Sequence, residues 1–187
     1  MKKENKEEVG IYAQARITKV KLGKEVCIEY EVEHSDIIDA HKLESPDEPT
    51  LEFKAALQEL AGDVCEIAEF GEEEEPKIKI HSISLSYKGE KTAKIMSASI
   101  SASRRLVRTN ERLNFLTPSL PEAPKSKKKP DPLDAVAKLP AHAAMQIYIV
   151  IDEARKYLNG IRAQTTMSFP KKKEEASLTL LTGENAN

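Results

Sequence analysis

Apolar and polar side chains alternate along several segments of the chain, which is the pattern of half-buried β-strands. Segment 25–33 shows it most clearly, because most of its odd positions are glutamates. Its apolar face consists of Val26, Ile28, Tyr30 and Val32. A similar alternation over 11–22 precedes it, and Gly23 supplies a turn between the two segments. The two segments are therefore predicted to form an antiparallel hairpin.

Segments 77–87 and 92–103 are the second predicted pair of strands, with a turn around Gly89. In the first of them the phase of the apolar residues changes near His81 and Ser82, which predicts a β-bulge or a switch of face. In the second, small apolar residues alternate with serines. One face carries Met96, Ala98, Ile100 and Ala102, and the other carries Ser97, Ser99, Ser101 and Ser103.

Apolar residues spaced by three and four positions predict two helices. The first covers about 51–68, with the stripe Phe53, Leu57, Leu60, Val64 and Ile67. The second covers about 140–159, where Pro140 suits a first turn and Gly160 suits a left-handed cap. Its stripe consists of Ile147, Ile151, Ala154 and Leu158. The glutamates at 72–75 oppose the dipole of the first helix and are expected to be mobile.

Strands in hairpins with separate helices predict an α+β fold. We expect an antiparallel sheet of about four strands in two hairpins with a helix between them, and a C-terminal helix after a linker rich in proline and lysine. The polar segment 34–49 is interpreted as a connector. By composition, the chain divides into a flexible N-terminus (1–8), an α+β core domain (9–117), the linker (118–138), a C-terminal helical segment (139–169) and a flexible tail (170–187).

Composition narrows the function classes. The chain has 187 residues, aromatics make up 5% of it and there is no tryptophan, which argues against a broad platform for stacking bases. No apolar run reaches the roughly 20 residues of a membrane span, so no membrane contact is expected. The charged start lacks the apolar stretch of a secretion signal, and two cysteines make no disulfide framework. A cytoplasmic location is expected.

Charge is sorted along the chain. Residues 25–75 contain 18 acidic and two basic residues, a balance of −16, whereas residues 76–130 contain 13 basic and three acidic residues, a balance of +10. The net charge of −2 hides this asymmetry. Such sorting indicates contact with nucleic acid, an electrostatically selected protein partner, or mutual neutralisation of two surfaces.

The basic residues supply candidate phosphate ligands. Guanidinium groups pair with phosphate oxygens in a bidentate fork, and a lysine run adds charge without fixed geometry. The predicted nucleic-acid-binding residues are Arg104, Arg105, Arg108, Arg112, Lys125, Lys127, Lys128 and Lys129. Their expected ligand is single-stranded or duplex DNA. The alternative is a solvated strand end followed by a soluble linker.

The acidic half supplies the rival hypothesis. Glu29, Glu31 and Glu33 would dock a basic host or phage protein, unless they are simply the solvent face of a strand. A loop with His34, Asp36, Asp39 and His41 contains suitable ligands for divalent metals, but its spacing matches no strong signature and leaves metal binding open. No nucleophile motif or phosphate-binding glycine loop is present, so neither catalytic residues nor a cofactor are predicted.

Several segments resemble a group of small uncharacterised proteins encoded by bacteriophages and prophages. They are the strand sequence at 80–87, the proline-containing stretch at 114–121, the helix end at 153–164 and the helix segment at 57–69. Segment 92–103 departs from the glycine-containing pattern of that group. The resemblance implies an accessory role, often beside genes for DNA replication or recombination, and transfers no catalytic residue.

The sequence therefore predicts a non-catalytic phage-type accessory protein that contacts nucleic acid through its basic residues, with a role in phage DNA replication or recombination. The alternative is a protein-interaction or host-inhibitory module that uses the acidic surface of residues 25–75.

Overall fold

The computed structural model describes residues 12–34, 37–89, 95–123 and 137–163. The expected flexible ends, 1–8 and 170–187, lie outside these residues. So does most of the predicted linker, including Lys125, Lys127, Lys128 and Lys129.

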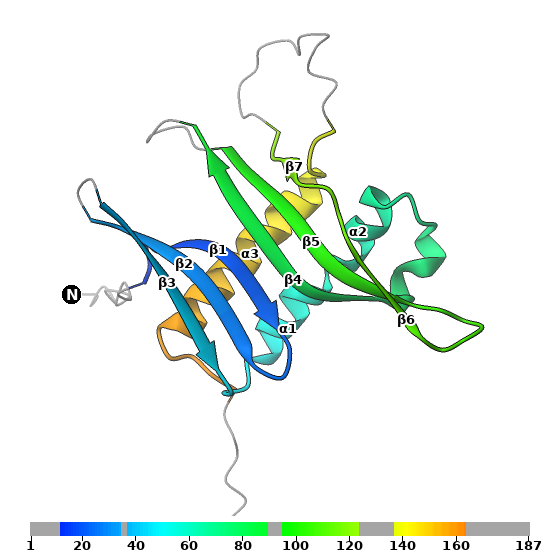
Figure 1. The fold of residues 1–187 in the computed structure, drawn as a ribbon, viewed down its shortest axis with the longest axis horizontal. Coiled ribbons are helices and arrows are strands. Elements are labelled where there is room, and N and C mark those ends of the chain that lie inside the picture. The colour runs from blue at the N-terminus through cyan, green and yellow to red at the C-terminus, as the bar shows by residue number, and fades with distance from the viewer. Residues whose placement is uncertain (1–11, 35–36, 90–94, 124–136, 164–187) are drawn as a thin grey trace, which may run out of the picture.

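One antiparallel sheet forms the first of two layers (Figure 1). Its strands are β1 (Arg16–Leu22), β2 (Val26–His34), β3 (Ile37–Ser45), β4 (Ile78–Lys88), β5 (Ile95–Arg105), β6 (Arg112–Leu116) and β7 (Leu120–Pro121). Their order in the sheet is β3-β2-β1-β4-β5-β6, and β7 also pairs with β5. The α+β class and the antiparallel pairing are confirmed. The number of strands is corrected from about four to seven.

The additional edge strand β3 comes from the segment that was interpreted as a connector. It pairs with β2 along its whole length, from Val26 opposite Ser45 to His34 opposite Ile37. Nearly all its side chains are exposed. Only its end is covered, where Ser45 is buried and Leu43 packs against the core. Because both faces of the rest of β3 are exposed, its sequence carries no alternation of apolar and polar residues, and the usual signal of a strand is missing.

Strands β6 and β7 follow the other edge of the sheet, alongside β5. Prolines at 118 and 121 interrupt ordinary strand pairing here. Thr117 maintains contact across the break, because its backbone N–H donates to the Ile100 carbonyl at 2.9 Å and its hydroxyl accepts from the Ile100 N–H at 2.9 Å. The buried Ile100 amide is thereby satisfied without a regular ladder.

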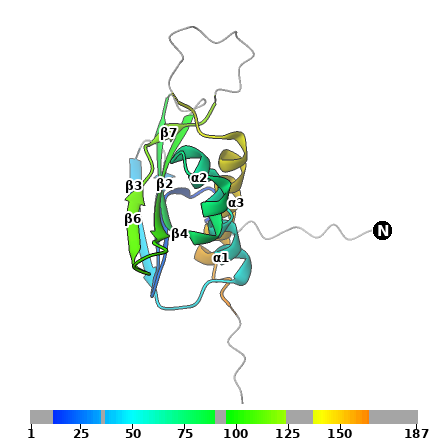
Figure 2. The same cartoon turned by 90° about the vertical axis from the view of Figure 1, so that its right-hand side faces the viewer.

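The helices form the second layer and cover one face of the sheet (Figure 2). They are α1 (Leu51–Gln58), α2 (Ala61–Ile67), the 3-10 helix η1 (Glu72–Lys77) and α3 (Ala141–Leu158). The single helix predicted over 51–68 is divided between α1 and α2. The glutamates at 72–75, for which mobility was expected, lie in the 3-10 helix η1. None of the helices in the described ranges is long and apolar enough to cross a membrane.

The core lies between the two layers. Its sheet side includes Val26, Ile28 and the apolar face of β5, as alternation predicted, whereas Tyr30 and Val32 are only half-buried. The register of β4 with β5 shifts between Ile80 and Ser82, which confirms the predicted bulge. Helix α3 packs against this core, with Ala143, Ile147, Val150 and Ala154 fully buried. The sequence left open whether this helix joins the core; in the structure it supplies much of the helical layer.

Along the path from β3 to β6, the shortest pairing joins β1 and β4, which meet only from Lys19 opposite Ser84 to Lys21 opposite Ser82. Beyond this junction the two halves of the sheet splay apart (Figure 1). Side chains replace the missing ladder there. The Gln58 amide donates to the Ile78 carbonyl at 2.9 Å and accepts from the Ile80 N–H at 3.3 Å, and the Tyr87 hydroxyl donates to the Ile17 carbonyl at 2.8 Å.

A histidine–carboxylate pair joins α2 to α3. Asp63 on α2 is buried, and His142 in the first turn of α3 places its Nδ1 3.0 Å from Oδ2 and 3.1 Å from Oδ1 of that carboxylate. The hydrogen bond and the negative charge of Asp63 raise the pKa of His142 above its ordinary value of 6.5. The pair therefore favours the protonated imidazole in the folded chain.

Stability is expected to depend on pH through this pair. Because the pKa of His142 is higher in the folded than in the unfolded chain, its contribution is complete below about pH 6.5 and is lost as pH rises through the folded pKa. The difference in free energy of unfolding between the wild type and His142→Gln should be larger at about pH 5.5 than at about pH 8.5 in urea denaturation. In the Asp63→Asn background that pH dependence should vanish. A difference independent of pH would contradict this assignment.

Candidate nucleic-acid interface

The sheet has one face without helices, which we call the open face; it is turned towards the viewer in Figure 1. Side chains on this face are those that alternate with the buried ones. Across the strands they fall into rows, such as Glu29, Lys19, Ser84 and Ser99 on β2, β1, β4 and β5. The open face is therefore built from polar residues whose neighbours are set by register.

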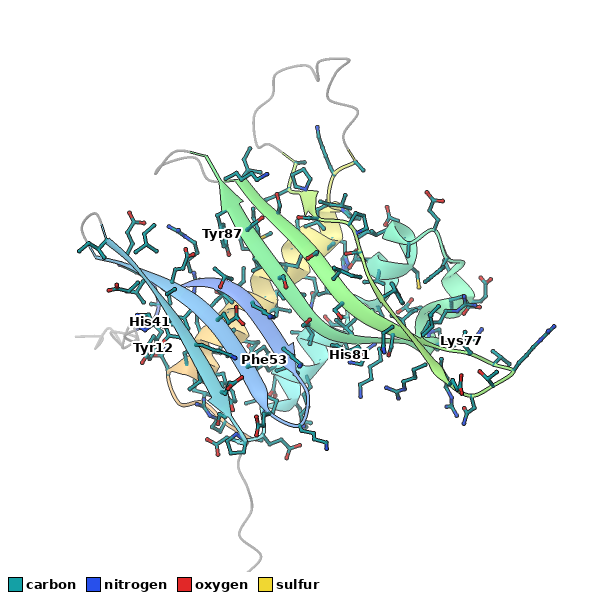
Figure 3. The ribbon with its side chains drawn as sticks, viewed as in Figure 1. Tyr12, His41, Phe53, Lys77, His81 and Tyr87 are labelled. Carbon is teal, nitrogen blue, oxygen red and sulfur yellow. The ribbon has the colours of Figure 1, made fainter. Side chains whose placement is uncertain are left out.

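Basic side chains gather at one end of the open face, where β4 begins and β5 ends. This basic corner is formed by Lys21, Lys79, His81, Arg105 and Arg112. Arg105 lies directly opposite Arg112 in the β5–β6 ladder. Lys79 lies opposite Ser103, whose hydroxyl is 2.8 Å from His81 Nε2 (Figure 3). Four strands thus bring these residues together from distant positions in the chain.

The positive charges of the basic corner act on His81. Its pKa is lowered, first by burial and then by the charges of Lys79, Arg112 and Lys21. Within the described ranges, no carboxylate forms an ion pair with those three residues or with Arg105. The Arg105 Nε donates instead to the neutral Asn110 Oδ1, at 2.6 Å. Like charges directly opposite each other in a ladder are destabilising, and Arg105 and Arg112 are such a pair. At the other side of the corner, the pKa of Glu44 is lowered first by its hydrogen bond with Lys42 and also by the charge of Lys21.

Arg104, a predicted nucleic-acid ligand, lies on the opposite face of the sheet. Its Nε donates to Glu74 Oε2 at 2.7 Å, and its guanidinium carbon lies 5.2 Å from the centre of the Phe70 ring. Glu74 also accepts from Lys77 at 2.8 Å, and these partners lower its pKa, with the Lys77 hydrogen bond as the largest cause. The Arg104 guanidinium is thus used within the protein, where it links β5 to η1.

Arg108 lies in the turn between β5 and β6 and is exposed. The turn is closed by Leu106, whose N–H donates to the Glu111 carbonyl and whose carbonyl accepts from the Asn110 N–H. Asn110 has a φ of 60°, in the left-handed region that asparagine tolerates. All four predicted arginines therefore lie on the β5–β6 hairpin, with Arg105 and Arg112 on the open face, Arg108 in the turn and Arg104 on the opposite face.

The predicted partner-binding glutamates lie on β2 beside basic residues of β1. Arg16 forms ion pairs with Glu31 and Glu33, each at 3.0 Å, and Lys19 pairs with Glu29 at 3.3 Å. Such exposed pairs contribute little to stability. They nevertheless place a positive group next to each glutamate, so this surface is much less negative than the sequence of β2 alone indicates.

Of the residues considered as metal ligands, His34 is the last residue of β2, and Asp39 and His41 lie on β3. The His41 ring stacks on Tyr30, with ring centres 5.2 Å apart, and Asp39 lies opposite Val32. Asp36 and the side chain of His34 lie outside the described residues. In the part of the chain that is described, no three histidine, cysteine or acidic side chains come together as a metal site would require.

Three members of the basic corner were not selected from the sequence, namely Lys21, Lys79 and His81. Each is separated from the arginine cluster by at least 20 positions, and only the adjacency of β1, β4, β5 and β6 unites them. The sequence did contain a signal that Arg105, rather than Arg104, lies on the open face. Arg104 continues the buried phase of Ala98, Ile100 and Ala102, whereas Arg105 continues the serine phase.

Comparisons with known proteins return no relative of this chain. No family model matches it, no curated protein matches it and no solved structure matches it. The resemblance of several segments to phage-encoded proteins therefore stays an expectation. The candidate interface rests on the residues of this chain and their arrangement.

Proposed function

We propose that the protein is a non-catalytic accessory protein that binds nucleic acid through the basic corner and the adjoining Arg108. The observation that carries this proposal is the direct opposition of Arg105 and Arg112 on the open face. No carboxylate of the described residues compensates either guanidinium. A bound phosphate would relieve their repulsion and accept the bidentate hydrogen bonds that arginine offers.

The mode of contact follows from the other residues of the open face. Tyr30, Tyr87 and Phe115 are half-buried on the helical side, so among the described strands no aromatic ring besides His81 stands on the open face. Base stacking therefore contributes little, and phosphate contacts dominate. Binding should tolerate many sequences and depend strongly on salt. The resemblance to phage proteins supports a role in phage DNA replication or recombination.

A fluorescence-anisotropy titration tests this proposal with labelled single-stranded and duplex DNA at about 50 mM and about 200 mM salt. We expect wild-type binding to weaken by at least about tenfold between the two concentrations. Arg112→Ala should lower affinity several-fold for every sequence and reduce the salt slope by about one, because one phosphate contact is lost.

Arg104→Ala is the matched control, since it removes a neighbouring arginine from the other face of the sheet. It should lower stability through the loss of the Glu74 pair, while DNA affinity stays at the wild-type value. The absence of wild-type binding at low salt would refute the proposal. Equal losses of affinity in both arginine variants would show that the basic corner is not the binding surface.

A further inference from the structure

Six serines form a strip along the middle of the open face. They are arranged in three directly opposed pairs across β4 and β5. The pairs of this serine strip are Ser82 with Ser101, Ser84 with Ser99, and Ser86 with Ser97. All six side chains are at least partly exposed to solvent. The strip is as wide as two strands and continues directly into the basic corner through Ser103 and Lys79.

The hydroxyls of the strip are unused by the fold. Within the described residues, none of the six forms a hydrogen bond with a protein group. Neighbouring hydroxyls differ, because Ser103 is bound to His81 and Thr117 accepts from the Ile100 amide. Each free hydroxyl offers one donor and two acceptor lone pairs. The strip therefore presents a regular array of donors to whatever lies on the face.

Stability alone gives no reason for six serines at these positions. Strand faces favour β-branched and aromatic residues, and serine lacks the branch that makes threonine suitable. The β2 part of the same face uses long charged residues that pair with β1. The neighbours of the strip have longer side chains: Lys19 and Lys21 on β1 lie opposite Ser84 and Ser82, and Leu116 on β6 lies opposite Ser101.

The dimensions of the strip suit one extended polymer chain. Successive serine pairs are two residues apart along the strands, or about 6.6 Å. Strand β1 flanks the strip at Ser82 and Ser84, and β6 flanks it at Ser101; where both are present they are three strand spacings apart, or about 14 Å. That width is less than the diameter of a nucleic-acid duplex. An extended single strand fits between the flanking side chains and places its phosphates at intervals similar to those of the serine pairs.

We propose that the serine strip binds the sugar–phosphate backbone of single-stranded nucleic acid, which runs along β4 and β5 into the basic corner. The serine hydroxyls donate to phosphate oxygens, as serines commonly do in such complexes, and fix the path of the strand without reading bases. Lys21 beside Ser82 and the Arg105–Arg112 pair supply the charge. This inference rests on the function proposed above and assigns the ligand class and its direction.

Anisotropy titrations with an oligothymidylate of about 20 nucleotides test the path of the strand. Ser84→Asp combined with Ser99→Asp should weaken binding by about tenfold or more, because two carboxylates then face the phosphates. Ser84→Ala combined with Ser99→Ala should weaken it by about two- to fivefold. Ser119→Asp, an exposed serine outside the strip, is the matched control and should leave the affinity unchanged.

Titrations with other polyanions test whether the ligand is single-stranded nucleic acid. Oligouridylate should bind like oligothymidylate, whereas a duplex and inorganic polyphosphate should bind more weakly and should be insensitive to the serine substitutions. If oligothymidylate binding requires Arg112 but is unaffected by both serine double variants, this inference fails and the proposed function stands. If wild-type protein binds no nucleic acid, both fail. A duplex that binds more tightly than the single strand also overturns the inference.

Thermal unfolding is measured for each variant, to check that the measured affinity is that of a folded protein. If the double variant does not fold because its two aspartates are directly opposed, the single variant Ser84→Asp is used instead. Its position opposite Lys19 allows a favourable cross-strand pair, so this variant is expected to fold. It should weaken oligothymidylate binding by about threefold or more. An unchanged affinity in that folded variant refutes the inference.

Discussion

Replacing Tyr157 with alanine is expected to lower the free energy of unfolding by about 4 kcal/mol. Tyr157 lies near the end of α3 and is only 1% exposed. Its ring lies against Phe53 of α1, with ring centres 6.0 Å apart, and its hydroxyl donates to the Asp47 carbonyl at 2.6 Å. Truncation removes this packing and leaves a cavity between α1 and α3. Urea denaturation followed by circular dichroism measures the loss.

Two further variants separate the contributions of Tyr157. Tyr157→Phe keeps the ring and removes the hydrogen bond, so it should cost about 1 kcal/mol. Tyr148→Ala changes a tyrosine on the same helix that is 42% exposed and bonded only to Glu122 among the described groups, and should cost far less than Tyr157→Ala. If Tyr157→Ala and Tyr148→Ala were equally mild, α3 would not be an integral part of the core.

Charge reversal at Arg112 is expected to separate binding from stability. Arg112→Glu should weaken DNA binding by about a hundredfold at low salt, because a phosphate ligand becomes a repulsive group. The same change should raise the free energy of unfolding by about 0.2–1 kcal/mol, since the new carboxylate lies directly opposite Arg105. A gain in stability together with a loss of DNA affinity is the result that the proposed binding role of Arg112 predicts.

The measurement combines an anisotropy titration with denaturation of the same preparations. Arg104→Gln serves as the opposite case: it should keep DNA affinity and lower stability, because Glu74 and the Phe70 ring lose their contacts with the Arg104 guanidinium. If Arg112→Glu is less stable than the wild type and binds DNA equally well, the basic corner is not the DNA-binding surface.

The sequence predicted the central part of the fold because burial on one side leaves a periodic signal. Strands β2, β4 and β5, the bulge after Ile80 and the position of α3 were all found in this way. Strand β3 was missed because both its faces are exposed, and β6 with β7 because prolines break the pattern. The division of the first helix at Glu59 and Leu60 was hidden by an apolar stripe that continues through both helices.

The candidate site could be predicted only in part, because the sequence of one strand does not show which strand it pairs with or in which register. Sorting of charge along the chain drew attention to the arginines of the β5–β6 hairpin. It did not show that Arg104 would pair with Glu74 of the acidic half, or that Arg16 and Lys19 would neutralise β2. Lys21 joins the basic corner only because β1 lies next to β4. That adjacency depends on the path of the whole chain.

Strand β3 has a consequence for how this protein behaves at high concentration. It is a nine-residue edge strand without proline, and Ile37 and Ile38 at its start are 65% and 52% exposed on opposite faces. Edges of this kind can recruit a further strand from another molecule, a hazard that natural sheets usually suppress. Self-association at high protein concentration would therefore start at β3. The substitution Ile38→Lys should suppress it, because it places a charge on this edge.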